Sequence, residues 1–237
     1  MQRYFVSCNN DNITVSNDDI FHITKVMRMK IGDEFEVNND GDVYLCKVSG
    51  LNPFNFEIIK KYDEDHELRV YTRLLYCIPK GEKIDLVIQK ATELGVNEIV
   101  LVNSSRCIAK ITNENKSKKL ERFNKIAKEA SEQCKRTKLP IIENVIDYKD
   151  IVKFKSDMNL IAYENATSSL KDLRNKLDKF DGKSISILIG AEGGFSKEEV
   201  EYASNNDFEI ITLGKRILRS ETSVFYALSI LGYHFDN

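Results

Sequence analysis

Two polar loops near the C-terminus hold the residues whose types and spacing could do chemistry. The first loop, Gly190–Phe195, follows an apolar run, and the second, Leu213–Arg219, precedes a helix expected to begin near Ser220. The basic residues of the second loop are Lys215, Arg216 and Arg219. Arginine suits phosphate or planar oxygen groups because its guanidinium fork is rigid and always charged, and a helix N-terminus adds N–H donors. The two loops therefore predict a site for a nucleotide-like ligand.

The glycines of the first loop do not form a known nucleotide fingerprint. Gly190, Gly193 and Gly194 lack the Gly-x-Gly-x-x-Gly spacing of dinucleotide sites, and the chain has no Walker A lysine motif. They offer close backbone approach and conformational freedom. Ser196 with Glu199 predicts a capping box that starts the next helix. In the second loop, Glu221 either complements the helix dipole or holds a carboxylate among arginines at a ligand site.

Alternating strands and helices are expected to position these loops. From residue 68 onward, buried strands are predicted at 68–78, 98–102, 159–163, 185–190 and 208–214. Helices are predicted between them, with apolar faces at 84–94 and 120–134, and at 170–177 and 197–203. This order favours an α/β fold with a parallel sheet covered on both faces. Ligands of such sheets bind beyond the carboxyl ends of the strands, where both loops lie.

The first 70 or so residues have a different pattern. Short strands are predicted at 3–7, 34–37, 43–50 and 53–62, with a helix at 18–28 and an Asp-Gly hairpin turn at 38–41. This pattern suggests a small barrel. The charged stretch 60–67 reads as a linker, so the predicted domains are 1–69 and 70–237.

Composition narrows the function classes. No apolar run reaches the ~18 residues needed to cross a bilayer, and the N-terminus lacks signal-peptide features, so we expect a cytoplasmic protein without a membrane segment. The five cysteines (8, 46, 77, 107 and 134) and three histidines show no metal-ligand spacing, which predicts reduced thiols and no metal site. The net charge of −2 excludes a uniformly basic nucleic-acid binder. Residues 103–138, however, hold eleven Lys and Arg against four Glu, a pattern that fits either a phosphate-binding patch or a solvated helix face.

Taken together, the motifs resemble the SPOUT methyltransferases, and within them the bacterial enzymes that methylate N3 of a uridine in 16S ribosomal RNA (the RsmE family). The resemblance rests on Gly190-Ala-Glu-Gly-Gly-Phe and Leu213-Gly-x-Arg-Ile-Leu-Arg-x-Glu-Thr. It extends to 89–96, to Ser105-Arg106, to 129–136, and to His22–Arg28 with Gly32-Asp33, so it covers nearly the full chain. Ala191 stands where the family usually has Pro, which loosens the loop slightly.

The resemblance implies a PUA-like β-barrel followed by a SPOUT domain whose C-terminal segment forms a trefoil knot. It also implies a homodimer, S-adenosyl-L-methionine as cofactor, and 16S ribosomal RNA of the small ribosomal subunit as partner, with uridine 1498 as the family target. Carried over by position, the cofactor residues are Gly190, Glu192, Gly193, Gly194, Leu213, Gly214, Ile217, Leu218 and Thr222.

The expected chemistry assigns roles to two more residues. Uridine N3 carries a proton at neutral pH, so its methylation requires removing that proton and stabilising the charge left on the base oxygens. We hypothesise that Arg219 stabilises this charge, and that Glu221 is either the base or the group orienting Arg219. The candidate RNA-binding residues are His22, Lys25, Arg28, Arg106 and Arg136. His22 is equally compatible with a packed, hydrogen-bonded role.

Three other functions are weighed against this one. A ribose 2′-O-methyltransferase would use similar loop chemistry. A non-catalytic RNA-binding or ribosome-assembly protein would have no need for the Arg219–Thr222 segment. A nicotinamide-dependent oxidoreductase is the least supported, because the dinucleotide fingerprint is missing.

Overall fold

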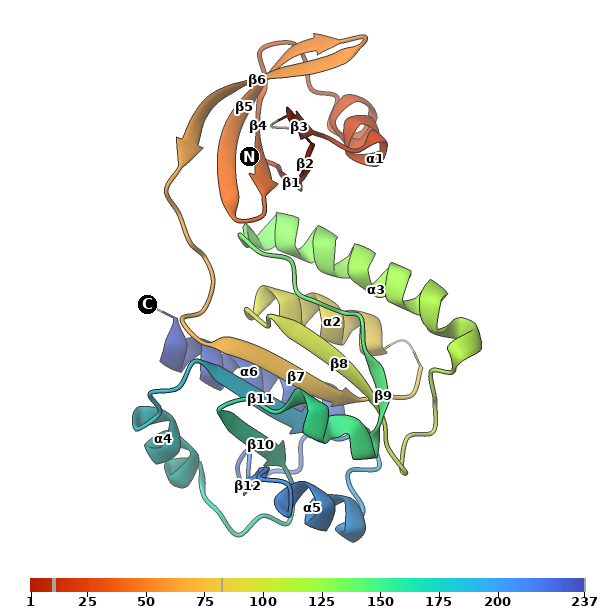
Figure 1. Cartoon of the computed structure of the whole chain (residues 1–237), viewed down its shortest axis with the longest axis vertical. Coiled ribbons are helices and arrows are strands. Elements are labelled where there is room, and N and C mark those ends of the chain that lie inside the picture. Colours follow the sequence, from red (N-terminus) through yellow and green to blue (C-terminus); the bar gives the residue numbers. More distant parts are fainter. Residues whose placement is uncertain (10–11, 82, 237) are drawn as a thin grey trace. The chain divides into compact units, whose positions relative to one another are not determined.

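The computed structural model describes residues 1–9, 12–81 and 83–236, and the chain forms two compact units (Figure 1). The first unit contains Met1–Glu67 and Lys128–Leu139, and the second contains Leu68–Ala127 and Pro140–Asn237. The sequence predicted a division near residue 69 and did not anticipate that 128–139 would join the first unit. Backbone contacts explain this addition, because the Asn38 side chain donates to the carbonyls of Arg136 and Thr137 at 3.2 and 2.8 Å.

The first unit is built on a four-stranded sheet in the order β1-β4-β5-β6. Its strands are β1 (Arg3–Phe5), β4 (Glu34–Asn39), β5 (Asp42–Leu51) and β6 (Phe54–Tyr62), and a separate hairpin joins β2 (Ser7–Asn9) to β3 (Asn12–Thr14). The predicted Asp-Gly turn is confirmed: Asp40 and Gly41 have φ of 49° and 99°, as a two-residue hairpin requires. The aromatic rings of Tyr4, Phe35 and Phe56 pack in the core of this unit.

The helix predicted at 18–28 has two parts. Helix α1 (Asn17–Phe21) starts at Ser16, whose hydroxyl accepts from the Asp19 amide at 3.1 Å. It continues as the π-helical turn η1 (His22–Val26), where the Met27 amide donates to the His22 carbonyl at 2.8 Å. Arg28 then adopts a positive φ of 52°, which ends the helix. Apolar spacing predicted the helix, but spacing does not distinguish α from π hydrogen bonding.

The second unit contains a six-stranded sheet in the order β12-β10-β11-β7-β8-β9, and every neighbouring pair is parallel. Its strands are β7 (Tyr71–Cys77), β8 (Glu98–Asn103), β9 (Val145–Asp147), β10 (Met158–Ala162), β11 (Ser184–Ile189) and β12 (Glu209–Ile211). The prediction of a parallel α/β sheet is therefore confirmed. The central strands are almost wholly buried, as expected for a sheet covered on both faces.

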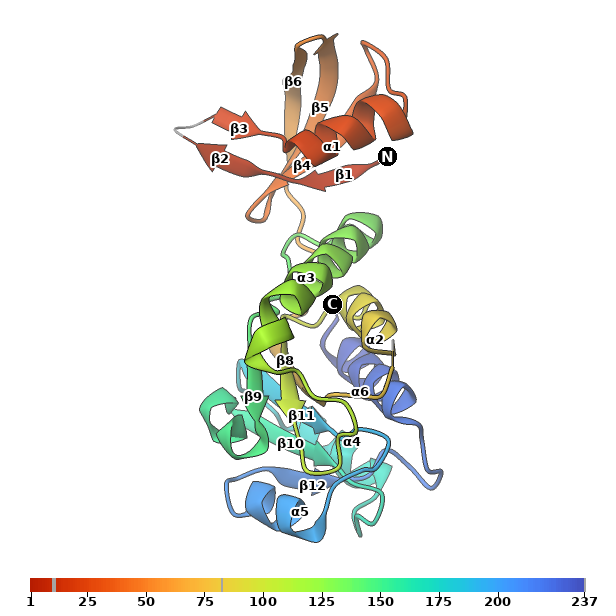
Figure 2. The same cartoon turned by 90° about the vertical axis from the view of Figure 1, so that its right-hand side faces the viewer.

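Helices cover this sheet. Helices α2 (Lys83–Glu93) and α6 (Ser220–Phe235) pack against each other on one side (Figure 2). Helix α5 (Lys197–Ser204) packs against the 3₁₀ helix η2 (Tyr148–Phe154), and the remaining helices are α3 (Asn113–Cys134) and α4 (Leu170–Asp178). The sequence did not predict β9 or η2, because each is too short to show a periodic apolar pattern. Among the described residues, no helix has the length and apolar character to cross a bilayer.

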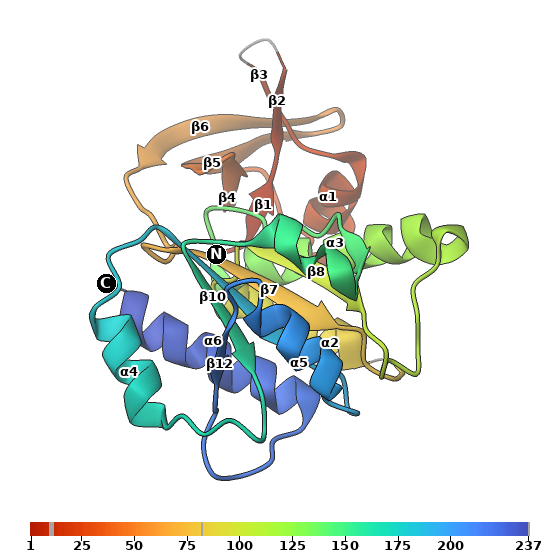
Figure 3. The same ribbon diagram turned by 60° about the horizontal axis from the view of Figure 1, so that its bottom comes forward.

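The sheet order explains why the two polar loops meet. Strand β10 pairs with β11 on one side and with β12 on the other. The glycine loop (190–196) leaves β11, and the arginine loop (212–219) leaves β12 and returns to the start of α6 (Figure 3). Because all three strands are parallel, both loops emerge at the carboxyl edge, on either side of the end of β10.

Candidate active site

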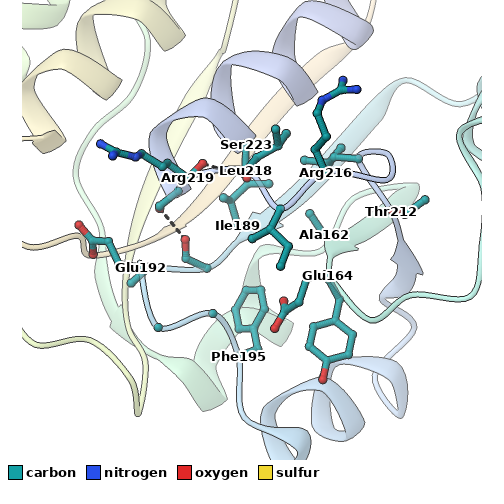
Figure 4. Close-up of a pocket in the computed structure, with 18 of the residues that line it drawn as sticks. Ala162, Glu164, Ile189, Glu192, Phe195, Thr212, Arg216, Leu218, Arg219 and Ser223 are labelled. Carbon is teal, nitrogen blue, oxygen red and sulfur yellow. Dashed lines mark hydrogen bonds between the residues drawn. The ribbon is translucent and has the colours of Figure 1, made fainter.

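A pocket of about 480 Å³ lies between the glycine loop and the arginine loop (Figure 4). Its lining combines apolar side chains such as Ile189, Phe195 and Leu218 with charged ones from both loops. This volume falls within the 300–1,000 Å³ typical of small-molecule sites. The arrangement suits a ligand with an apolar ring and charged ends.

The glycine loop is closely packed against its neighbours. A β-carbon at Gly193 would lie 3.1 Å from the Arg106 side chain, and one at Gly190 would lie 3.2 Å from the Phe195 ring. Gly194 has a positive φ of 62°, and a β-carbon there would lie 3.4 Å from a carboxylate oxygen of Glu164. The backbone conformation of Gly194 therefore favours glycine, and a side chain at Gly190 or Gly193 would require its neighbours to shift.

Two side chains tie the glycine loop to the segment after β8. The predicted capping box is confirmed, since Ser196 accepts from the Glu199 amide and Glu199 accepts from the Ser196 amide at 2.9 Å. The other oxygen of Glu199 accepts from the Ser105 amide at 2.8 Å. Arg106 donates to the Gly193 carbonyl at 2.8 Å. These bonds hold one wall of the pocket in place.

Ser220, the first residue of α6, joins the two loops at the base of the pocket. Its hydroxyl lies 2.6 Å from the Gly190 carbonyl oxygen and 3.1 Å from the Tyr76 hydroxyl. A serine hydroxyl has one hydrogen and a carbonyl only accepts, so Ser220 donates to Gly190 and accepts from Tyr76. Burial raises the pKa of Tyr76 far above its usual value, which keeps this hydroxyl a donor.

Charged groups surround the mouth of the pocket. Lys83 at the start of α2 lies 3.0 Å from a carboxylate oxygen of Glu192 and 3.4 Å from one of Glu221. Burial raises the pKa of Glu192, but hydrogen bonds from its own backbone, Lys83 and the Lys80 amide outweigh this effect and the pKa is lowered overall. Arg219 lines the pocket and its side chain is exposed. Glu192 is therefore held as a carboxylate by Lys83 and the Lys80 amide.

The structure brings together most of the residues predicted for this site. Those that line the pocket are Gly190, Glu192, Gly193, Gly194, Leu213, Gly214, Ile217, Leu218 and Arg219. Glu221 is not among the lining residues, but it accepts a hydrogen bond from Lys83, and Lys83 does line the pocket. Thr222 lies outside the lining and is exposed.

Sequence reasoning missed several lining residues. Tyr163 and Glu164 follow β10, Thr212 follows β12, and Lys83 begins α2. The first three could have been found from the rule that ligands bind beyond strand ends. Lys83 could not, because it belongs to a helix that is distant in sequence and reaches the site only through packing of α2 on α6.

The candidate RNA-binding residues divide into three groups. Lys25 and Arg28 are exposed on the first unit, whereas His22 is half-buried and its Nδ1 lies 2.9 Å from the Tyr4 hydroxyl. Arg106 belongs to the second unit and is not among the lining residues, but it donates to the Gly193 carbonyl of the glycine loop. Arg136 corrects a prediction: its side chain is only 4% exposed and forms an ion pair with Glu67. A guanidinium buried in this way cannot offer itself to a phosphate.

Ion pairs also reduce the basic character of segment 103–138. Within the residues that the structure describes, four of its eleven basic residues are paired with acidic side chains: Arg122 with Asp85, Lys128 with Asp19, Lys135 with Glu36, and Arg136 with Glu67. Local sequence counts ignore these partners, because they lie far away in the chain. The charge available to a polyanion is therefore smaller than the sequence suggests.

No metal site is evident in the part of the chain that the structure describes. Within these residues, no group of three or more His, Cys, Asp or Glu could hold an ion. Cys46, Cys77, Cys107 and Cys134 are free thiols. The side chain of Cys8 lies outside the described part.

Comparison with known proteins identifies the family. A family described as the RNA methyltransferase domain matches residues 66–232, and one described as the RNA methyltransferase PUA domain matches residues 15–60. The ribosomal RNA small subunit methyltransferase E of Bacillus subtilis (strain 168) is 32% identical over 100% of this chain and 98% of its own length.

Two solved structures are similar over almost the whole chain. One is a putative methyltransferase from Legionella pneumophila with bound S-adenosylmethionine, at 27% identity and a TM-score of 0.86, covering 98% of this chain and 96% of the other. The other is a ribosomal RNA small subunit methyltransferase E from Neisseria gonorrhoeae bound to S-adenosyl methionine, at 26% identity and a TM-score of 0.86, covering 98% and 97%. With the fold, the pocket and these matches in agreement, the chain belongs to the ribosomal RNA small subunit methyltransferase E family, with an N-terminal PUA domain.

Proposed function

We propose that this protein transfers the methyl group of S-adenosylmethionine to N3 of a uridine in 16S ribosomal RNA, uridine 1498 in the family numbering. The observation that carries the proposal is the pocket between two strand-end loops, with Arg219 exposed at its edge. The matching relatives are named for methylation of small-subunit ribosomal RNA, which supports the same reaction class here.

The pocket suits the proposed cofactor. Ile189, Phe195 and Leu218 provide apolar surface for an adenine ring. Glu164 and Arg216 offer a carboxylate and a guanidinium to the polar and charged parts of the cofactor, and the glycine loop offers backbone groups at close range. When bound, S-adenosylmethionine supplies a methyl group on a positively charged sulfur.

The residues of this chain would supply the rest of the chemistry. The uracil must lose its N3 proton before it becomes a good nucleophile, and the negative charge then moves onto its carbonyl oxygens. Arg219 is the proposed partner of that charge, because it lines the pocket with an exposed side chain and a charge-assisted hydrogen bond is about twice as strong as a neutral one. Glu221 is proposed either as the base or as a residue that orients its neighbours.

RNA recognition is proposed to involve both units. Lys25 and Arg28 are exposed on the PUA-containing unit, with His22 beside them, and Arg106 is bonded to the glycine loop of the second unit. Folded ribosomal RNA presents phosphates and shape more than readable base edges, so basic side chains in these places suit the substrate.

Further properties belong to the same proposal. The PUA-like and methyltransferase domains would divide near residues 69–70, and the C-terminal segment would be knotted as in SPOUT enzymes. A homodimer is supported by large side chains left exposed on the second unit, including Ile217 at 88% and Tyr233 at 93%. A bacterial ribosomal RNA substrate would place the reaction in the cytoplasm. Size measurement by light scattering tests the dimer directly.

The proposed role of Arg219 is tested with Arg219→Ala. Removing one donor to a developing charge typically lowers kcat by about 10²–10³, so we expect a loss of this size with unchanged affinity for S-adenosylmethionine. Methyl transfer to small ribosomal subunits and calorimetric binding of the cofactor measure the two effects. Arg174→Ala is the control, because Arg174 is an exposed arginine on α4, outside the pocket. Full turnover in Arg219→Ala would remove this residue from the mechanism.

A further inference from the structure

Three segments that are distant in sequence meet at one corner of the pocket. They are the end of β7 with the start of α2, the glycine loop, and the first turn of α6. At the base of this corner, Tyr76, Ser220 and Gly190 join the three segments through the buried serine hydroxyl. The mouth of the pocket has a second connection between the same segments.

Lys83 makes this second connection. Its ammonium group lies 3.0 Å from Glu192 of the glycine loop and 3.4 Å from Glu221 of α6. The Lys80 amide also donates to both oxygens of Glu192, at 3.3 and 3.1 Å. The Glu221 side chain is only 15% exposed, so the Lys83 ammonium group replaces part of the water contact that this side chain loses by burial. The two carboxylates also raise the pKa of Lys83, with the Glu192 hydrogen bond as the larger cause.

We propose that Lys83 is a positioning residue for methyl transfer, which clasps Glu192 and Glu221 together and so fixes the glycine loop against the start of α6. Lys83 does not itself contact the reacting atoms in this account. The proposal rests on the function proposed above, and it decides between the two roles left open for Glu221. A carboxylate held by an ammonium group anchors the loop that carries Arg219, so Glu221 orients Arg219 and is not the base.

The contacts of Lys83 also distinguish the paired cations from the unpaired cations among the described residues at the mouth of the pocket. Lys83 is engaged by two carboxylates, whereas Arg219 has an exposed side chain. Arg219 is therefore among the cations left available for a negatively charged base, together with Lys215 and Arg216 of the same loop. Misplacing Arg219 by about 1 Å would be enough to lower the rate by about 10²-fold.

Lys83→Met tests the clasp, with Lys90→Met as a matched control. Lys90 lies on the same helix, is similarly exposed (41% against 36%), and forms its own ion pair with Glu93 at 2.8 Å. We expect Lys83→Met to lower kcat by tenfold or more while KM for the RNA changes less, because only positioning is lost. Lys83→Arg should recover most of the rate, and Lys90→Met should match the unmodified protein. Equal rates in Lys83→Met and Lys90→Met would overturn the proposal.

Hydrogen exchange provides a readout that does not depend on activity. Losing the clasp should speed amide exchange in both 190–194 and 219–223 of Lys83→Met, and in neither segment of Lys90→Met. If exchange rises but the unmodified protein does not methylate uridine, the clasp stands and the proposed function fails. If uridine is methylated but exchange is unchanged, the clasp is wrong.

A double-mutant cycle identifies the partner. Glu221→Gln removes the negative charge on α6 that pairs with Lys83. Adding Lys83→Met to Glu221→Gln should therefore lower kcat little further. If the two losses multiply instead, Lys83 and Glu221 act independently and the orienting role of Glu221 is refuted.

Discussion

Replacing Ser220 with alanine should weaken the second unit and its pocket by a predictable amount. The substitution removes the hydroxyl that links the Gly190 carbonyl to the Tyr76 hydroxyl. Both groups then lose a hydrogen-bond partner inside the protein, and leaving a buried polar group unsatisfied costs about 1–3 kcal/mol. Taking the two groups together, we expect the free energy of unfolding to decrease by about 3 kcal/mol. This corresponds to a fall in Tm of roughly 6–12 °C for a domain of this size.

The partner of Ser220 sharpens this prediction. Tyr76→Phe removes only the donor to Ser220 and leaves the bond to Gly190 in place, so it should cost about 1 kcal/mol. In the double variant there is no tyrosine hydroxyl left without a partner. The free energy of unfolding should therefore fall by about 1 kcal/mol less than the sum of the two single-variant decreases. Urea unfolding of the four proteins, with and without S-adenosylmethionine, measures these energies. Calorimetry should also show weaker cofactor binding in Ser220→Ala, because the two loops are no longer joined.

Ser229→Ala is the control for this series. Ser229 lies on the same helix and is exposed, so its loss should change stability by less than about 0.5 kcal/mol. Additive losses in Ser220→Ala and Tyr76→Phe would refute the hydrogen-bonded chain. An unchanged cofactor affinity in Ser220→Ala would refute the claim that this chain shapes the pocket.

Two further predictions concern the first unit. Arg136→Ala should destabilise the protein by about 3–5 kcal/mol, because it leaves Glu67 buried without its ion-pair partner. Lys138→Ala is the control and should not destabilise the protein, because Lys138 is exposed. Thermal unfolding of both variants measures the difference. Burial raises the pKa of Glu132 to about 7, so its protonated form is the one that the folded state prefers. Its contribution to the unfolding free energy should be fully present below pH 4.5 and should be lost as pH rises to about 7. Glu132→Gln should remove this dependence, and an unchanged pH profile of urea unfolding in that variant would contradict the assignment.

The sequence predicted the parts of the fold that periodic patterns encode. Buried strands read as apolar runs, so β10 and β11 were located to within a residue or so, and the capping box at Ser196 placed the start of α5. Short elements such as β9 have too few residues for a period to show. The attachment of 128–139 to the first unit was not predictable either, because it depends on contacts between distant residues such as Asn38 and Thr137.

The candidate site also contains residues that the sequence pattern revealed and residues that only three-dimensional contacts revealed. Residues in the two loops were found because they interrupt apolar strands with glycine and arginine. Lys83 was missed because its role depends on carboxylates more than 100 residues away in the sequence. Arg136 was misassigned for the related reason that charge counts take no account of burial. Sequence reasoning therefore located the loops, while the three-dimensional contacts determined which charges are free to act.

The most direct test of the account is to identify the methylated nucleoside. The protein would be incubated with S-adenosylmethionine and small ribosomal subunits that lack the modification, and the RNA would be digested and analysed by mass spectrometry. We expect N3-methyluridine at one position, strongly reduced in Arg219→Ala and retained in Arg174→Ala. A 2′-O-methylated nucleoside would contradict the base-directed chemistry proposed for Arg219. Absence of any product together with absence of cofactor binding would contradict the proposed methyltransferase activity itself.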